Sequence, residues 1–463
     1  MSDNTKKRLF DHKFDIVAFI LIAGIFIYFM IFNEVVDCGD SFQYANQLPM
    51  REPVYSLLIQ LFQTVSGEAY RIPLGIFQNI LAIICIYWTY RRISRIYDFR
   101  SLFRIATLAL LLAPHIITPL ASKTSLVLTS TVMTEGITIS LYYVWFTVLI
   151  GILWEHYSNK KDMILAVTVD TALGLILAMT RGQMVICLVV ELLVICFKLI
   201  EQKNNTVKKR LISILICFLI FFVITGVKGI LTKAYNYAET GYFVKTVSSG
   251  PMLLANIVYV SDENDAEYLA DEDLRQAYIR IVREIDEEGI SISDASGSII
   301  QKARFHESGH ETINFDHIDP NIREVIEIRY GIDSSEFVNL MIIEDRVCKE
   351  ASMQLLKHIF PRYIKNYMII ACLGFVRSVA VDRAFLSIYA VLIYITAIVL
   401  TIMLLKKDLR NRQAQTMLLT LILICGTVLG TSLVIECITR YMIYNLPIFY
   451  ISGMGMIKAL KES

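Results

Sequence analysis

The feature of this sequence that most restricts its fold is a series of long apolar runs. A helix needs about 20 mostly apolar residues to cross the hydrocarbon core of a bilayer. Of the 463 residues, 55% are hydrophobic and 19% are charged, against about 45–50% and about 25% in soluble domains. The sequence therefore predicts an all-α, polytopic integral membrane protein with about ten spanning helices. The expected spans are about 14–34, 73–90, 104–120, 131–154, 163–180, 183–200, 211–230, 384–405, 414–436 and 441–458.

The basic residues predict how these spans are oriented. If all ten runs cross the bilayer, every basic cluster falls on the same side, and loops rich in Lys and Arg are typically cytoplasmic. We therefore expect a multi-pass protein of the plasma membrane with both termini in the cytoplasm. The clusters are Lys6–Lys13, Arg91–Arg104, Lys160–Lys161, Lys203–Arg210, Lys406–Arg412 and Lys458–Lys461.

This orientation divides the chain into three parts. Residues 1–231 form an N-terminal transmembrane module with a first outer loop at 35–72, residues 232–383 a mostly helical extracytoplasmic segment, and residues 384–463 the C-terminal transmembrane helices. The net charge of +1 gives no reason to expect a nucleic-acid partner. The nine cysteines lack the paired spacing of a disulfide framework or a CxxC metal site.

The first outer loop carries the most informative stretch of the chain. Asp40 and Ser41 are a helix start signal, and Pro49 ends the short run that follows. Pro53 suits the first turn of a second helix. We expect two short interfacial helices here, which would place carboxylates and an arginine at the lipid–water boundary.

Four basic side chains are expected at the same outer membrane level, at the outer ends of spans. They are Arg51, Arg181, Arg440 and Lys228. Guanidinium groups match phosphate oxygens and stay charged, and a nearby carboxylate can take a proton from a hydroxyl. The pattern predicts a site for a lipid-linked phosphate, although each arginine alone is also explained by contact with lipid headgroups.

The same residues carry a family resemblance. The segments Asp40-Ser-Phe-Gln-Tyr44 and Arg51-Glu-Pro-Val-Tyr55-Ser resemble the first-loop patterns of the GT-C superfamily of membrane glycosyltransferases, in particular the glycosyltransferase 39 / protein O-mannosyltransferase-like group. Glu52 stands where that family usually has proline. The resemblance implies inverting transfer of a sugar from a polyprenyl-phosphate carrier to an acceptor hydroxyl on the extracytoplasmic face.

The resemblance also implies roles for individual residues. Asp40 would be the general base, with Asp37 as a second candidate. The four basic residues named above would hold the donor phosphate. The remaining pocket residues would be Tyr44, Tyr55, Glu135 and Tyr441. A helix cap is the alternative role of Asp40, and hydrogen bonding at a helix start is that of Glu135.

Two other functions remain open. A flippase for lipid-linked sugars would need the arginines but not Asp40. A zinc metalloprotease is suggested by His306-Glu307-Ser-Gly309-His310, whose histidines lie one helical turn apart. Gly309 weakens that helix, and no third ligand is marked, so the two histidines are weak metal candidates.

The sequence predicts no certain cofactor other than the polyprenyl-phosphate-linked sugar, and a role for a divalent cation is left open. The expected partners are this donor, membrane lipids, and an acceptor that is a glycan, a lipid or a protein.

Overall fold

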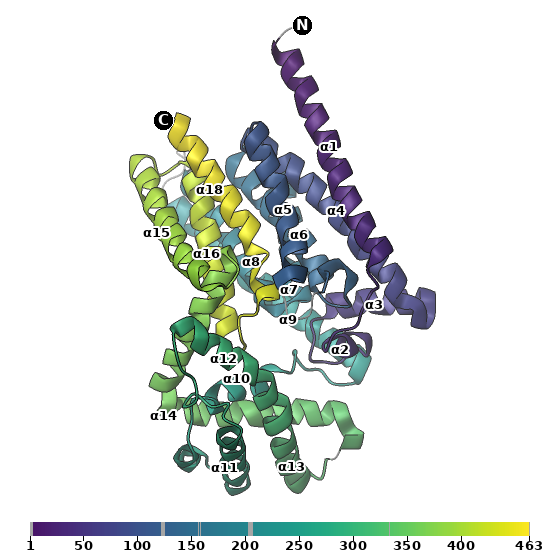
Figure 1. The fold of residues 1–463 in the computed structure, drawn as a ribbon, viewed down its shortest axis with the longest axis vertical. Coiled ribbons are helices and arrows are strands. Elements are labelled where there is room, and N and C mark those ends of the chain that lie inside the picture. The colour runs from purple at the N-terminus through teal and green to yellow at the C-terminus, as the bar shows by residue number, and fades with distance from the viewer. Residues whose placement is uncertain are drawn as a thin grey trace.

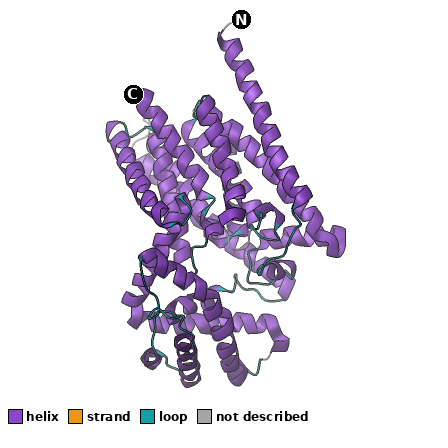
Figure 2. Ribbon diagram, viewed as in Figure 1, coloured by secondary structure: helices purple, strands orange, loops and turns teal. Residues whose placement is uncertain are grey.

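A computed structural model describes residues 3–121, 126–155, 157, 159–201, 207–332 and 334–462. Parts of the predicted basic clusters, including Lys203, lie outside these residues. Within them the protein is built of helices and loops (Figure 2), and its one isolated β-bridge pairs Val36 with Thr131. The all-α prediction is confirmed for this part of the chain.

The helices follow one another with short connections. The α-helices are α1 (Asp3–Phe32), α2 (Ser41–Ala45), α3 (Pro53–Ser66), α4 (Arg71–Ile96), α5 (Ser101–Ala121), α6 (Glu135–Trp154), α7 (Lys160–Thr180), α8 (Val185–Glu201), α9 (Val207–Thr240), α10 (Ser249–Val258), α11 (Glu272–Glu287), α12 (Ile299–Thr312), α13 (Asp319–Tyr330), α14 (Phe337–Val379), α15 (Ala384–Lys407), α16 (Arg412–Ser432), α17 (Thr439–Met442) and α18 (Asn445–Glu462). Between them lie the 3-10 helices η1 (Gly67–Tyr70), η2 (Leu128–Ser130), η3 (Gly182–Met184), η4 (Glu263–Tyr268) and η6 (Ser334–Glu336), and the π-helix η5 (Ile313–Ile318).

Nine helical stretches of the described chain are long and apolar enough to cross a membrane, which makes this a membrane protein by the composition and length of its helices. One of the nine joins α3, η1 and α4 into a single stretch, Pro53–Ile96. The tenth expected span corresponds to α18, whose last turns carry Lys458 and Lys461 and which is not among the nine.

The helices form an upper bundle and a lower helical body (Figure 1). The upper bundle contains the long apolar helices and both marked chain ends, whereas α10 to α13 lie below it. Apolar side chains of α10, α11, α13 and the first part of α14 form a core of their own. The last part of α14 packs instead with α15, α16 and α18. The 43-residue α14 therefore links the two bodies.

The first loop is attached to the segment before α6. The amide of Val36 donates to the carbonyl of Ser130 (3.1 Å), and the amide of Val132 donates to the carbonyl of Val36 (3.0 Å). The buried Ser41 hydroxyl donates to the carbonyl of Val132 (2.7 Å) and accepts from the amide of Cys38 (2.7 Å). These bonds fix the start of α2 beside the start of α6.

Substitution Ser41→Ala should therefore destabilise the fold. It removes both hydrogen bonds at a buried position, and each bond contributes about 1 kcal/mol. We expect a clear fall in the melting temperature of the purified protein in detergent. Thr64→Ala is the control, because the Thr64 hydroxyl bonds only to its own helix, on an exposed face. Equal melting temperatures for the two variants would contradict this role of Ser41.

Candidate functional site

A cavity of about 310 Å³ lies where the upper bundle meets the lower body. One wall comes from the first loop and from the starts or connections of α6, η3 and α17. The opposite wall comes from the segment before α10, from α12 and from η5. Helix ends leave backbone and side-chain polar groups unpaired within the helix, so this meeting of helix ends gives the cavity a polar lining.

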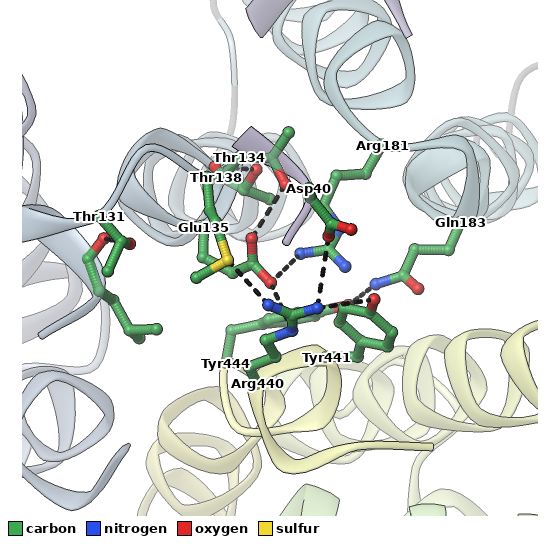
Figure 3. Close-up of polar contacts among 12 residues, drawn as sticks. Asp40, Thr131, Thr134, Glu135, Thr138, Arg181, Gln183, Arg440, Tyr441 and Tyr444 are labelled. Carbon is green, nitrogen blue, oxygen red and sulfur yellow. Dashed lines mark hydrogen bonds and ion pairs between the residues drawn. The ribbon is translucent and has the colours of Figure 1, made fainter. Parts of the chain in front are cut away.

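Two carboxylates and three guanidinium groups form one ion-pair network in this cavity. Figure 3 shows the part of it that joins Asp40, Glu135, Arg181 and Arg440. Asp40 binds Arg51 (Oδ1 to Nη2, 2.6 Å) and Arg440 (Oδ2 to Nη2, 3.4 Å). Glu135 binds Arg181 (Oε1 to Nη1, 2.8 Å) and Arg440 (Oε1 to Nε, 3.5 Å). The structure thus brings together Asp40, predicted as the base, and three arginines predicted to bind phosphate. Glu135 belongs to the same network.

Local structure explains the position of each charged group. Asp40 immediately precedes α2 and makes no side-chain cap hydrogen bond, so its carboxylate is not used as the helix cap that was its alternative role. Glu135 is the first residue of α6 and Arg181 lies between α7 and η3. Arg440 lies in the short helix α17, just after the connection from α16.

Tyrosine rings support the arginines. The guanidinium carbon of Arg181 lies 4.4 Å from the centre of the Tyr441 ring, and that of Arg440 lies 5.2 Å from the same ring. Arg51 stacks in the same way on Tyr44, at 5.1 Å. Such cation–π contacts orient the guanidinium planes and favour their charged form. Tyr44 and Tyr441 therefore line the cavity as predicted.

The arginines keep their charge despite burial. Burial by itself lowers the pKa of Arg181. The negative charge of Glu135 and the neighbouring Tyr441 raise the pKa by more than burial lowers it, so the net pKa lies above the ordinary value. The pKa of Arg440 is raised in the same way, with burial opposed by Tyr441, Glu135 and Asp40. The cavity thus contains permanently cationic side chains of the kind that bind phosphate.

Three residues predicted for the site lie elsewhere. Asp37 does not line the cavity and instead pairs with Arg71 (2.5 Å). Tyr55 is fully buried behind Tyr44, edge-to-face with its ring. The ammonium group of Lys228 pairs with Glu52. None of these three side chains lines the cavity, and their contact with substrate stays a prediction.

Glu52 explains the position of Lys228. This carboxylate lines the cavity and also accepts hydrogen bonds from Thr232 and Thr246 (both 3.3 Å). A buried carboxylate needs such partners to remain charged. Lys228 therefore neutralises a wall residue rather than facing the cavity.

The His-Glu-x-x-His motif lies on α12, as its spacing requires. Its Glu307, however, forms an ion pair with an arginine. It pairs with the buried Arg377 (2.8 Å), which holds α12 against α14. The Nδ1 atom of His310 lies 3.0 Å from a carboxylate oxygen of Glu436. In the described part of the chain, no group of three or more His, Cys, Asp or Glu side chains is arranged to hold a metal ion. Glu307 and His310 are thus engaged in pairs, whereas the buried His306 packs edge-to-face against Tyr259.

Several cavity residues were not found from the sequence. These are Glu311, Asn314 and Phe315 from α12 and η5, Ser248 just before α10, and Ser249, the first residue of α10. The only signal near them was the histidine motif, which marks α12 but for a different chemistry.

Comparisons with known protein families, with curated proteins and with solved structures find no match for this chain. The site is therefore interpreted from its own geometry. That geometry can bind an anion between guanidinium groups while two carboxylates remain within hydrogen-bonding distance of the same groups.

The His310–Glu436 pair should make stability depend on pH. Burial lowers the pKa of His310, but Glu436 raises it more, so the net pKa is above the ordinary value. Burial raises the pKa of Glu436, and His310 lowers it more, so the net pKa is below the ordinary value. The histidine contribution is present below about pH 6.5 and is lost as the pH rises through the raised pKa. The glutamate contribution is present above about pH 4.3 and is lost as the pH falls through the lowered pKa.

His310→Asn tests this, because asparagine keeps a donor near the Nδ1 position but carries no charge. We expect the melting temperature of the wild type to exceed that of the variant most between about pH 4.3 and 6.5, and the difference to shrink above that window. In a Glu436→Gln background the same substitution should give no such pH dependence. A difference that stays constant from pH 5 to 9 would contradict an ionised pair.

Proposed function

We propose that this protein is a GT-C-type glycosyltransferase that moves a sugar from a polyprenyl-phosphate carrier to an acceptor hydroxyl. The observation that carries the proposal is the joining of Asp40 to Arg51 and Arg440 in one cavity that also contains Arg181. A site that cleaves a lipid-phosphate sugar needs a base and a cluster of cations within reach of one another.

In the proposed reaction, the acceptor hydroxyl oxygen attacks the anomeric carbon of the donor sugar. The bond from that carbon to the phosphate oxygen breaks, and its electron pair leaves with the lipid phosphate. Asp40 takes the hydroxyl proton. Attack opposite to the leaving group inverts the anomeric configuration. Arg181 and Arg440 stabilise the departing phosphate, whose negative charge increases in the transition state.

The ion pairs within the cavity support this assignment. Asp40 is held by the same guanidinium groups that would bind phosphate, so a phosphate that enters must compete with the carboxylate for Arg51 and Arg440. Competition of this kind frees the Asp40 oxygens to face the acceptor hydroxyl. Donor binding would therefore release the base toward the acceptor.

The proposal includes an orientation in the plasma membrane. About ten spans, with α1 starting and α18 ending in the cytoplasm, would place the cavity and residues 232–383 on the extracytoplasmic face. The two helices of the first loop, α2 and α3, would then lie at the outer membrane surface. The donor would enter from the bilayer with its isoprenoid chain in the hydrocarbon region.

Asp40→Asn should abolish transfer, because the amide cannot accept the hydroxyl proton at neutral pH. The purified protein is supplied with a panel of radiolabelled polyprenyl-phosphate sugars, and the consumption of donor and the formation of product are measured. We expect at least a 100-fold loss of turnover, in the range of about 10²–10⁴ for general-base removal. The matched control is Asp37→Asn, which removes a carboxylate of the same loop that does not line the cavity.

The outcomes separate the two leading functions. Full activity of Asp40→Asn in transbilayer movement of a lipid-linked sugar, with no transfer by the wild type, would replace the transferase by a flippase. Loss of transfer in both aspartate variants would mean that the loop, rather than the Asp40 carboxylate, is required.

The orientation can be tested by cysteine labelling in intact cells. Asp286→Cys, on the exposed face of α11, should react with a membrane-impermeant maleimide. Lys407→Cys, at the exposed end of α15, should react only after the cells are permeabilised, because positively charged ends are expected inside. The wild type with its own cysteines supplies the background. The reverse labelling pattern would contradict an extracytoplasmic cavity.

A further inference from the structure

The cavity wall opposite the arginines has a different chemistry. Its α12–η5 face presents the carboxylate of Glu311, the amide of Asn314 and the ring of Phe315. Ser248, just before α10, and Ser249, its first residue, also line the cavity. We call these five residues the α12–η5 wall.

The helix geometry explains why this wall is continuous. Glu311 and Phe315 are four residues apart, as are His310 and Asn314, and residues at this spacing lie on one face of a helix. The helix widens to a π-helix at Ile313–Ile318, a feature that is frequent at functional sites. Asn314 and Phe315 belong to this π-helix and line the cavity.

The wall has unused hydrogen-bonding groups. Asn314 is only 3% exposed, yet its Oδ1 atom has no hydrogen-bond partner in the described structure. Buried amide oxygens without partners are costly in proteins and call for a ligand or water. Glu311 makes no hydrogen bond or ion pair with another described residue, whereas Glu436 beside it is paired with His310. Burial, then the charge of Glu436, raises the pKa of Glu311.

These groups suit a ligand with several hydroxyls and an apolar face. Carboxylate and amide oxygens accept hydrogen bonds from hydroxyl groups, and serine hydroxyls both donate and accept. Phe315 is 44% exposed, which leaves an aromatic face for the C–H groups of a sugar ring. An isoprenoid or fatty alcohol would leave the amide and the carboxylate unpaired. The cavity volume of about 310 Å³ is at the small end of ligand sites, about 300–1,000 Å³.

We propose that the α12–η5 wall is the acceptor subsite and that the acceptor is a carbohydrate, bound through its hydroxyls by Glu311, Asn314 and the two serines. This inference rests on the proposed function, since it takes the arginine wall to hold the donor phosphate. The acceptor sugar lies between Phe315 and Asp40, so that one of its hydroxyls faces the base. The lower helical body thereby selects the acceptor, and the upper bundle binds the donor.

Binding of sugars to the purified full chain in nanodiscs tests this without any donor. The probes are methyl glycosides of common hexoses, hexosamines and pentoses, measured by saturation-transfer difference NMR and titration. A threonine-containing peptide and farnesol represent the other acceptor classes. We expect at least one methyl glycoside to bind, and neither the peptide nor farnesol to compete with it.

Two variants locate the binding. Glu311→Gln removes the charge and keeps the size, and Asn314→Leu removes the amide at similar volume. We expect Kd to rise about tenfold for Glu311→Gln and about fivefold for Asn314→Leu, the effect of losing a charged and a neutral hydrogen bond. Asp316→Asn is the control, because this exposed carboxylate of the same π-helix does not line the cavity. Its Kd should stay within twofold of the wild type.

Failure of this proposal is distinguishable from failure of the proposed function. If no glycoside binds, or if binding is unchanged in both variants, the carbohydrate subsite is overturned, even if the protein transfers sugar to a peptide or an alcohol. If a glycoside binds in a Glu311-dependent way but no polyprenyl-phosphate sugar is consumed, the subsite stands and the transferase is overturned.

Discussion

The structure depends above all on the cost of burying charge. A buried charge without a partner is strongly unfavourable, and removing one member of a buried pair costs about 3–5 kcal/mol. In this protein Asp40 and Glu135 are each shared between two arginines, and Arg440 bridges both carboxylates. The first loop, the start of α6 and the connections at Arg181 and α17 must therefore stay together. The network that could bind a substrate is also what closes the bundle at this end.

Under the proposed function, a phosphate could bind these arginines only if their ion pairs with the carboxylates rearranged. Each guanidinium group of the cluster has a carboxylate partner among the described residues. Under that function, an incoming phosphate would therefore exchange one anion for another.

Sequence reasoning placed the helices well and the site in part. The Asp40–Ser41 pair and Pro53 predicted where the two loop helices begin, because helix-start signals are local. Both helices begin there, although Asp40 makes no side-chain cap hydrogen bond. Asp40, Arg51, Arg181 and Arg440 were also expected at one level, since each ends or follows an apolar run. We also expected Asp37, Lys228 and Tyr55 beside them. Residues at the same depth in the membrane can still point their side chains in different directions, and depth is all that the sequence predicts. Lys228 turns to Glu52, and Asp37 to Arg71.

The sequence by itself determined that this is an all-helical membrane protein with a charged first loop, because hydrophobic length and local helix signals are properties of contiguous residues. Only the tertiary structure decided that Glu311, Asn314 and Phe315 face the arginines across one cavity. These residues are far in the chain from Asp40, and nothing in their own spacing marks them as a site. Their position is set by how α14 and the Arg377–Glu307 pair hold the lower body against the bundle, which depends on packing between distant segments.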